Sequence, residues 1–177
     1  GVAACPGVPG RLERVAAPGP VIGVVDYGHK PDSIVEVLAA LRRLAGDGSG
    51  RLIAVLGAGG DRDRGKRPLM GAAAARGADV VVVTDDNPRT EDPATIRAEV
   101  RVGAEAAGAD AKVVEVAGRA AAIEAAVALA GAGDVVVLLG KGHERGQEVA
   151  GEIRPFDDRV ELAAALGRRF APTGPRA

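Results

Sequence analysis

Short apolar runs alternate with longer amphipathic segments along most of the chain. The first run, Val21–Val25, is continuous, which is typical of a strand buried on both faces of a sheet. Similar runs predict four further strands at 52–56, 80–83, 113–116 and 135–139. Helical spacing predicts helices at 31–45, 67–76, 93–107, 119–130 and 157–169. In the first helix we expect one buried stripe, made of Ile34, Val35, Leu38, Leu41 and Leu44.

This alternation predicts an α/β fold with a mostly parallel sheet and helices on both faces. Ligands of such sheets bind at the carboxyl ends of the strands, which places candidate chemistry in the loops 26–32, 57–66, 84–92 and 140–148. Proline and glycine interrupt any regular pattern before residue 20. We therefore expect residues 1–19 to be a linker, residues 20–170 to form the domain, and residues 171–177 to be a disordered tail.

The composition of the chain argues against several classes of function. The chain has 177 residues, and 23 basic side chains face 24 acidic ones, so it has no net positive charge with which to bind nucleic acid. It has no apolar run long enough to cross a membrane, and its one cysteine cannot form an internal disulfide. One cysteine and two separated histidines give no metal-ligand spacing, and we expect neither a metal site nor a catalytic nucleophile.

The loop at 57–66 is rich in glycine and charge. Gly60 and Gly65-Lys66 have the spacing of a phosphate-binding P-loop, but Arg67 replaces the Ser or Thr that would bind Mg²⁺. The dinucleotide-binding fingerprint fails as well, because Arg62 stands at its third glycine position. Two interpretations remain, a tight turn with solvated charges and a site for a ligand that carries both carboxylate and ammonium groups.

The loop at 84–92 contains Asp86-Asn87-Pro88-Arg89. Pro88 favours an extended backbone at Asn87, which can aim the neighbouring side chains toward one point. Asp86 can accept hydrogen bonds from an ammonium group, and Arg89 can bind a carboxylate through two parallel hydrogen bonds. An Asx-type turn leading into the next helix explains the same residues without a ligand.

The remaining two loops hold the single tyrosine and both histidines. Tyr27 and His29 follow the first strand, where they can pack on a base or ribose; a surface turn capped by Asp32 is the alternative. After the fifth strand, the glycines at 140 and 142 allow a ligand to approach the backbone closely, and Glu144 adds a carboxylate. His143 is either a general base or a polar loop residue.

Taken in order, these loops resemble the C-terminal part of the Mur ligases, and in particular the members that add diaminopimelate. The segments that carry the resemblance are Asp26–Asp32, Gly57–Pro68, Asp86–Arg89 and Gly140–Glu144. Residues 9–13 and 155–159 are similar to the start and the last segment of that part, so the resemblance covers about residues 8–169. Gly28 departs from the family, in which alanine is commoner at this position.

The resemblance implies a Rossmann-like fold that receives the incoming amino acid. In the family, a first domain binds the UDP-sugar and a second domain binds ATP with its P-loop and Mg²⁺. This chain is similar to the third domain preceded by a linker. We therefore expect ATP and Mg²⁺ to be bound mainly by an upstream domain, and the chain alone to be inactive.

The resemblance also assigns site residues. Arg89 would bind the distal carboxylate of meso-diaminopimelate, and Asp86 and Glu144 would bind its distal ammonium. The complete set that matches diaminopimelate-binding positions is Arg62, Asp86, Asn87, Pro88, Arg89, Gly140 and Glu144. The residues that match the surroundings of the ATP adenine and ribose are Tyr27, His29 and Asp32, with Arg11 of the linker facing the nucleotide.

The implied reaction is ATP-driven amide formation in cytoplasmic peptidoglycan synthesis. ATP would phosphorylate the D-glutamate carboxylate of UDP-MurNAc-L-Ala-D-Glu, and the amine of meso-diaminopimelate would attack the acyl phosphate. None of the residues of this chain need be the base, because its contribution would be to hold the amine in place. The alternative is a free-standing module that binds a diamino acid or a nucleotide without catalysis. The Asp86–Arg89 run disfavours a related folate polyglutamate ligase.

Overall fold

A computed structural model describes residues 8–45 and 50–171 of the chain. Its strands are β1 (Glu13–Val15), β2 (Ile22–Asp26), β3 (Leu52–Leu56), β4 (Val80–Val83), β5 (Lys112–Glu115), β6 (Val135–Leu139), β7 (Gly146–Val149) and β8 (Glu152–Pro155). Its helices are α1 (Pro31–Arg42), α2 (Lys66–Gly77), α3 (Pro93–Glu105), α4 (Arg119–Leu129) and α5 (Asp158–Phe170).

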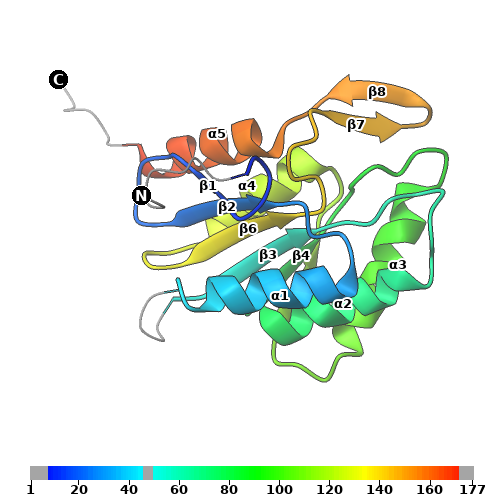
Figure 1. Ribbon diagram of the computed structural model, residues 1–177, viewed down its shortest axis with the longest axis horizontal. Coiled ribbons are helices and arrows are strands. Elements are labelled where there is room, and N and C mark those ends of the chain that lie inside the picture. The colour runs from blue at the N-terminus through cyan, green and yellow to red at the C-terminus, as the bar shows by residue number, and fades with distance from the viewer. Residues whose placement is uncertain (1–7, 46–49, 172–177) are drawn as a thin grey trace.

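The central sheet has the strand order β1-β2-β6-β3-β4-β5. All neighbouring pairs are parallel except β1 and β2, so the prediction of a mostly parallel α/β sheet is confirmed. Helices α1, α2 and α3 cover one face and α4 and α5 the other (Figure 1). The loops after the parallel strands therefore meet at one edge of the sheet, where the β7–β8 hairpin also projects.

The inner strands β3, β4 and β6 are apolar throughout because both faces of the sheet are covered there. Successive residues of a strand point to opposite faces. Val24 of β2 and Ala54 of β3 pack with α1 to α3, whereas Val25 and Val55 pack with α4 and α5. This two-sided burial explains why continuous valine and leucine runs, rather than alternating ones, mark these strands in the sequence.

The segment that contains α1 differs from the sequence prediction in two details. Val35 and Leu44 are exposed, while Val37 is buried, because the buried stripe follows Ile34, Val37, Leu38 and Leu41. Asp32 does not cap the helix: the N-cap residue is Lys30, whose backbone N–H donates to the Ser33 hydroxyl over 3.1 Å. Asp32 instead lies exposed in the first turn, where its charge suits the helix dipole.

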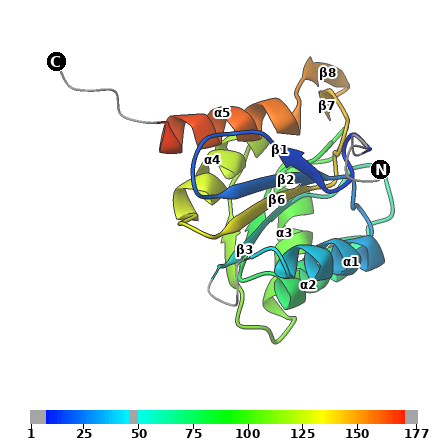
Figure 2. The ribbon, with the colours of Figure 1, turned by 60° about the vertical axis from the view of Figure 1, so that its left-hand side comes forward.

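Three strands were not predicted from the sequence. The sheet begins at Glu13 rather than after residue 20, because β1 pairs with β2 in the region predicted to be a linker (Figure 2). The β7–β8 hairpin occupies a segment for which no element was expected. Residues 1–7 of the predicted linker and 172–177 of the predicted tail lie outside the described residues. Among the described helices, none is long and apolar enough to cross a membrane.

Candidate functional site

Four loops at the carboxyl ends of β2, β3, β4 and β6 meet around one polar cavity of about 240 Å³. Its lining consists of Tyr27, His29, Gly59, Arg62, Lys66, Asp86, Asn87, Arg89, Gly140 and Glu144. Both carboxylates and cationic groups face this space, so the cavity can bind a ligand that carries both kinds of charge.

Most of the site residues expected from the sequence line this cavity, and three do not. Pro88 contributes its backbone to the turn behind Gly60, where a Cβ atom would lie only 1.9 Å from the Pro88 carbonyl oxygen. Arg11 lies beside the cavity, with its guanidinium 5.1 Å from the centre of the Tyr27 ring. Asp32 is exposed on α1 and makes no part of the lining.

Lys66 was missed as a site residue. Its ammonium is 3.4 Å from the His29 carbonyl oxygen, at the first residue of α2. The sequence feature that could have identified it is the Gly65-Lys66 pair, which has the spacing of a phosphate-binding loop. In the structure Arg67 is buried and binds the carboxylates of Glu91 and Glu99. The shortest distance from its guanidinium to each carboxylate is 2.8 Å. This segment is therefore anchored to α3 and is not built as a P-loop.

Arg89 is fixed from three directions. Its Nη1 donates to the Gly60 carbonyl over 2.8 Å, and its Nε lies 3.2 Å from the Glu148 carboxylate. Its backbone N–H donates to the carbonyl of Glu148 in β7, over 3.1 Å. These contacts hold Arg89 in a left-handed conformation with φ of 53°. The guanidinium is thereby presented at the cavity in one orientation, as a carboxylate receptor requires.

Asp86 is a buried carboxylate, with 8% of its surface exposed. Burial raises the pKa of Asp86 above its usual value, against the opposing charges of Arg119 and Lys141. Gly140 lies against this carboxylate: a Cβ atom at Gly140 would be 2.8 Å from Asp86 Oδ2, and its φ is 110°. Only glycine fits there without strain, so the backbone of residue 140 and Asp86 together form the floor of the cavity.

Asn87 and Glu144 come from different loops and contact each other. Asn87 Nδ2 donates to Glu144 Oε2 over 3.0 Å, and the fully buried Lys141 donates to Asn87 Oδ1 over 3.0 Å and to Glu144 Oε2 over 3.2 Å. The hairpin adds a further hydrogen bond of 3.0 Å, from the Glu148 backbone to Asn87 Oδ1. The acidic side of the cavity is therefore already assembled without a ligand.

Tyr27 and His29 add aromatic rings to the lining of the cavity. The Tyr27 ring lies 4.7 Å from that of His29 and 5.5 Å from that of His143, measured between ring centres. Together with Arg11, this cluster offers a surface on which a planar ring can stack. Among the described residues, there is no group of three or more His, Cys, Asp or Glu side chains that could hold a metal ion.

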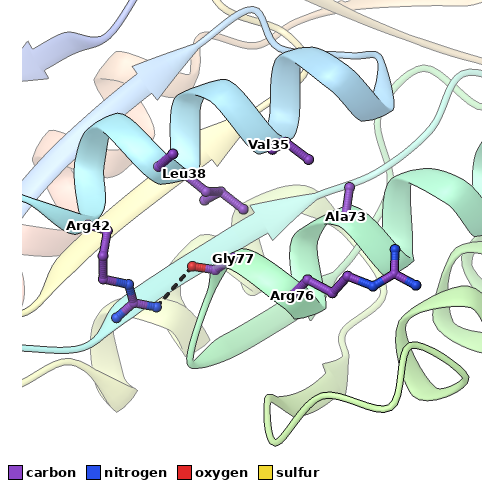
Figure 3. A pocket seen from close by; sticks show the side chains of 7 residues that line it. Val35, Leu38, Arg42, Ala73, Arg76 and Gly77 are labelled. Atoms are coloured by element: carbon purple, nitrogen blue, oxygen red, sulfur yellow. Dashed lines mark hydrogen bonds between the residues drawn. The ribbon is translucent and has the colours of Figure 1, made fainter.

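A second hollow, of about 320 Å³, lies between α1 and α2 (Figure 3). Val35, Leu38 and Ala73 line it with apolar groups, and Arg42 binds the Gly77 carbonyl over 2.9 Å at its rim. It receives no residue from the loops at the strand ends. The polar cavity is therefore the candidate site, because polar side chains from four loops, including charged groups from three of them, converge there.

The fold and this site define a class of protein. The family model described as the Mur ligase glutamate ligase domain matches residues 10–142, and the chain belongs to the Mur ligase family.

Three relatives with high sequence identity share one name within this family. A protein of Streptomyces avermitilis named UDP-N-acetylmuramoyl-L-alanyl-D-glutamate–2,6-diaminopimelate ligase is 55% identical over 168 residues, which are 94% of this chain and 33% of that relative. The protein of the same name in Caulobacter vibrioides is 56% identical over 162 residues, or 90% of this chain and 31% of the relative. A solved structure of a ligase with this name has a TM-score of 0.81 at 45% identity, covering 92% of this chain and 32% of that one. The chain thus spans about a third of the length of these relatives.

Proposed function

We propose that this chain is the amino-acid-receiving domain of an ATP-dependent ligase that joins meso-diaminopimelate to UDP-MurNAc-L-Ala-D-Glu in cytoplasmic peptidoglycan synthesis. The observation that carries the proposal is the single cavity in which Arg89, Asp86 and Glu144 converge from the ends of two parallel strands. The relatives named for this reaction support it, because they are more than half identical over nearly the whole chain.

The charges of the cavity match one end of the proposed amino acid. Each end of meso-diaminopimelate carries a carboxylate and an ammonium group. Arg89 would bind the distal carboxylate, and Asp86 and Glu144 would accept hydrogen bonds from the distal ammonium. Arg62 and Lys66 line the same cavity and add positive charge for a further carboxylate. An amino acid without a distal carboxylate would leave Arg89 without its ligand partner.

The role of the chain would be to hold the attacking amine in place. Binding the distal end in a fixed orientation positions the other amino group for attack, which lowers the entropic part of the barrier. ATP supplies the activation of the D-glutamate carboxylate and would be bound, with Mg²⁺, mainly by an upstream domain. The Tyr27, His29 and Arg11 cluster would contact the nucleotide from this side. Residues 8–12 would connect the two domains.

A chimera tests this proposal. The third of the Streptomyces avermitilis relative that matches this chain is replaced by the chain itself, and phosphate release is measured with UDP-MurNAc-L-Ala-D-Glu, ATP and each of two amino acids. We expect turnover with meso-diaminopimelate and at most a small fraction of that rate with L-lysine. The same relative without its matching third is the negative control and should be inactive.

Two outcomes would argue against the proposal. A folded chimera that binds ATP but releases no phosphate with meso-diaminopimelate would contradict the assigned substrate. Equal rates with L-lysine would contradict the role given to Arg89. Tight binding of meso-diaminopimelate by the isolated 177-residue chain, combined with an inactive chimera, would favour a binding module instead.

A further inference from the structure

A fully buried lysine lies behind the acidic side of the cavity. Lys141 follows β6, and its side chain has no exposed surface. Its ammonium lies 3.0 Å from Asn87 Oδ1, 3.2 Å from Glu144 Oε2 and 3.6 Å from Asp86 Oδ1. The ammonium therefore touches all three groups that form the acidic side, although it does not line the cavity.

Lys141 determines which atoms those groups present. An ammonium can only donate hydrogen bonds, so Asn87 must turn its carbonyl oxygen toward Lys141. The amide nitrogen of Asn87 then faces Glu144 and donates to Oε2 over 3.0 Å. Because Lys141 also binds Oε2, the other oxygen of Glu144 and the second N–H of Asn87 remain for a ligand. The Glu148 backbone N–H, which donates to the same oxygen of Asn87 over 3.0 Å, favours the same orientation, so Lys141 reinforces it.

Lys141 also balances charge. Asp86 is faced by Arg119 on α4, by Lys141 and Glu144 on the loop after β6, and by Asp158 on α5. Arg119 is itself paired with Asp158 over 2.6 Å. The charge of Arg119 acts on Asp86 more strongly than that of Lys141, but Lys141 is the cation that contacts both Asp86 and Glu144 directly. Removing it would leave the buried carboxylate of Asp86 beside that of the partly exposed Glu144 without this cation, which favours uptake of a proton by Asp86.

We propose that Lys141 is a positioning residue that keeps Asp86 ionised and orients Asn87 and Glu144, so that the cavity presents acceptors to the ammonium group of its ligand. This deepens the proposed function and rests on it for the identity of the ligand. The three contacts of the ammonium, its complete burial and its position behind the lining carry the inference.

The first test is Lys141→Met in the chimeric ligase, with Lys112→Met as the matched control, because Lys112 is exposed on the edge strand β5. We expect the KM for meso-diaminopimelate to rise at least about tenfold near neutral pH, as for loss of a charged hydrogen bond, with the KM for ATP within about twofold. The defect should shrink as the pH rises, since alkali ionises the carboxyl group of Asp86 again. Lys141→Arg keeps the charge and should restore part of the affinity.

A loss of affinity that is independent of pH would show a packing role and overturn the proposal. So would an unchanged KM for meso-diaminopimelate. If the unmodified chimera is itself inactive, the proposed function fails. The role of Lys141 is then tested separately in the 177-residue chain, by following the NMR signal of the Asp86 carboxyl carbon as the pH changes. Its NMR titration should move to higher pH in Lys141→Met but not in Lys112→Met, and an unmoved titration overturns the proposal.

A variant that fails to fold still gives an answer. If Lys141→Met does not fold, the double variant Asp86→Asn/Lys141→Met removes one of the charges that the lysine balances. We expect this double variant to fold, as judged by its circular dichroism and a cooperative urea transition. A double variant that also fails to fold would show that the lysine serves packing alone and would overturn the proposal.

Discussion

The guanidinium of Arg119 and the carboxylate of Asp158 form an ion pair in which neither side chain is exposed to solvent. Nε and Nη2 of Arg119 lie 2.7 Å and 2.6 Å from the two oxygens of Asp158, and Nη2 also donates to the Leu139 carbonyl over 3.0 Å. The pair joins the first turn of α4 to that of α5 at the end of β6. It thereby anchors two helices directly behind the strand end that leads into the acidic side of the cavity.

Breaking this pair should destabilise the fold strongly. We expect Arg119→Met to lower the free energy of unfolding by about 3–5 kcal/mol, because it leaves Asp158 buried and unpaired. The double variant Arg119→Met/Asp158→Leu should recover much of that loss. Urea unfolding of the 177-residue chain measures both. A double variant no more stable than the single one would argue that the pair contributes packing rather than charge compensation.

Arg89→Ala should weaken the binding of meso-diaminopimelate selectively. Removing one partner of a buried charged pair typically costs about 2–5 kcal/mol, which corresponds to a rise in KM of at least about 30-fold. The KM for ATP should stay within about twofold. Arg89→Lys should be intermediate, since it keeps the charge but loses the planar fork. Steady-state kinetics of the chimera measure these values, and equal increases for both substrates would contradict the assignment.

Asp86→Asn should stabilise the folded chain at neutral pH and abolish the binding of meso-diaminopimelate. Burial raises the pKa of Asp86, so the ionised form is the costly one in the folded state. The pKa of Asp86 is thus higher in the folded state than in the unfolded state. The fold is most stable below the pKa of the unfolded state, and it loses this stability as the pH rises through the pKa of the folded state. The variant should therefore be more stable than the parent at pH 7, with the difference disappearing in acid. Urea unfolding across this pH range would contradict the prediction if the order were reversed.

Glu91 should make the stability of the fold sensitive to acid. Its hydrogen bonds from Arg67 and from the Asp61 backbone lower the pKa of Glu91 from 4.5 to about 2. A carboxyl shifted downward stabilises the fold above its unfolded pKa, and this contribution is lost as pH falls toward 2. Glu91→Gln should thus be less stable than the parent at pH 7 and show a flatter loss of stability in acid. Glu36→Gln, at an exposed position on α1, is the control and should leave the profile unchanged.

The sequence predicted the five parallel strands and all five helices because their signals are local. Valine and leucine runs such as 52–56 and 135–139 match β3 and β6 to the residue. The stripe on α1 was partly wrong because a helix turns by about 100° per residue, which places Val35 beyond Ile34 on the side away from Val37 and Leu41. Leu44 lies beyond the end of α1 at Arg42. The hairpin was missed because β7 and β8 are mostly polar and lie on the surface.

The sequence by itself determined the strand ends, and with them the set of loops that surround the cavity. Its apolar runs set which segments are buried, and the carboxyl ends of parallel strands necessarily meet at one edge. Only the tertiary structure decided that Arg67, Arg119 and Lys141 are fully buried, since charged side chains are expected at the surface until a partner is known. Their partners, among them Glu91, Glu99 and Asp158, lie at least 24 residues away for both arginines, and only folding brings them together.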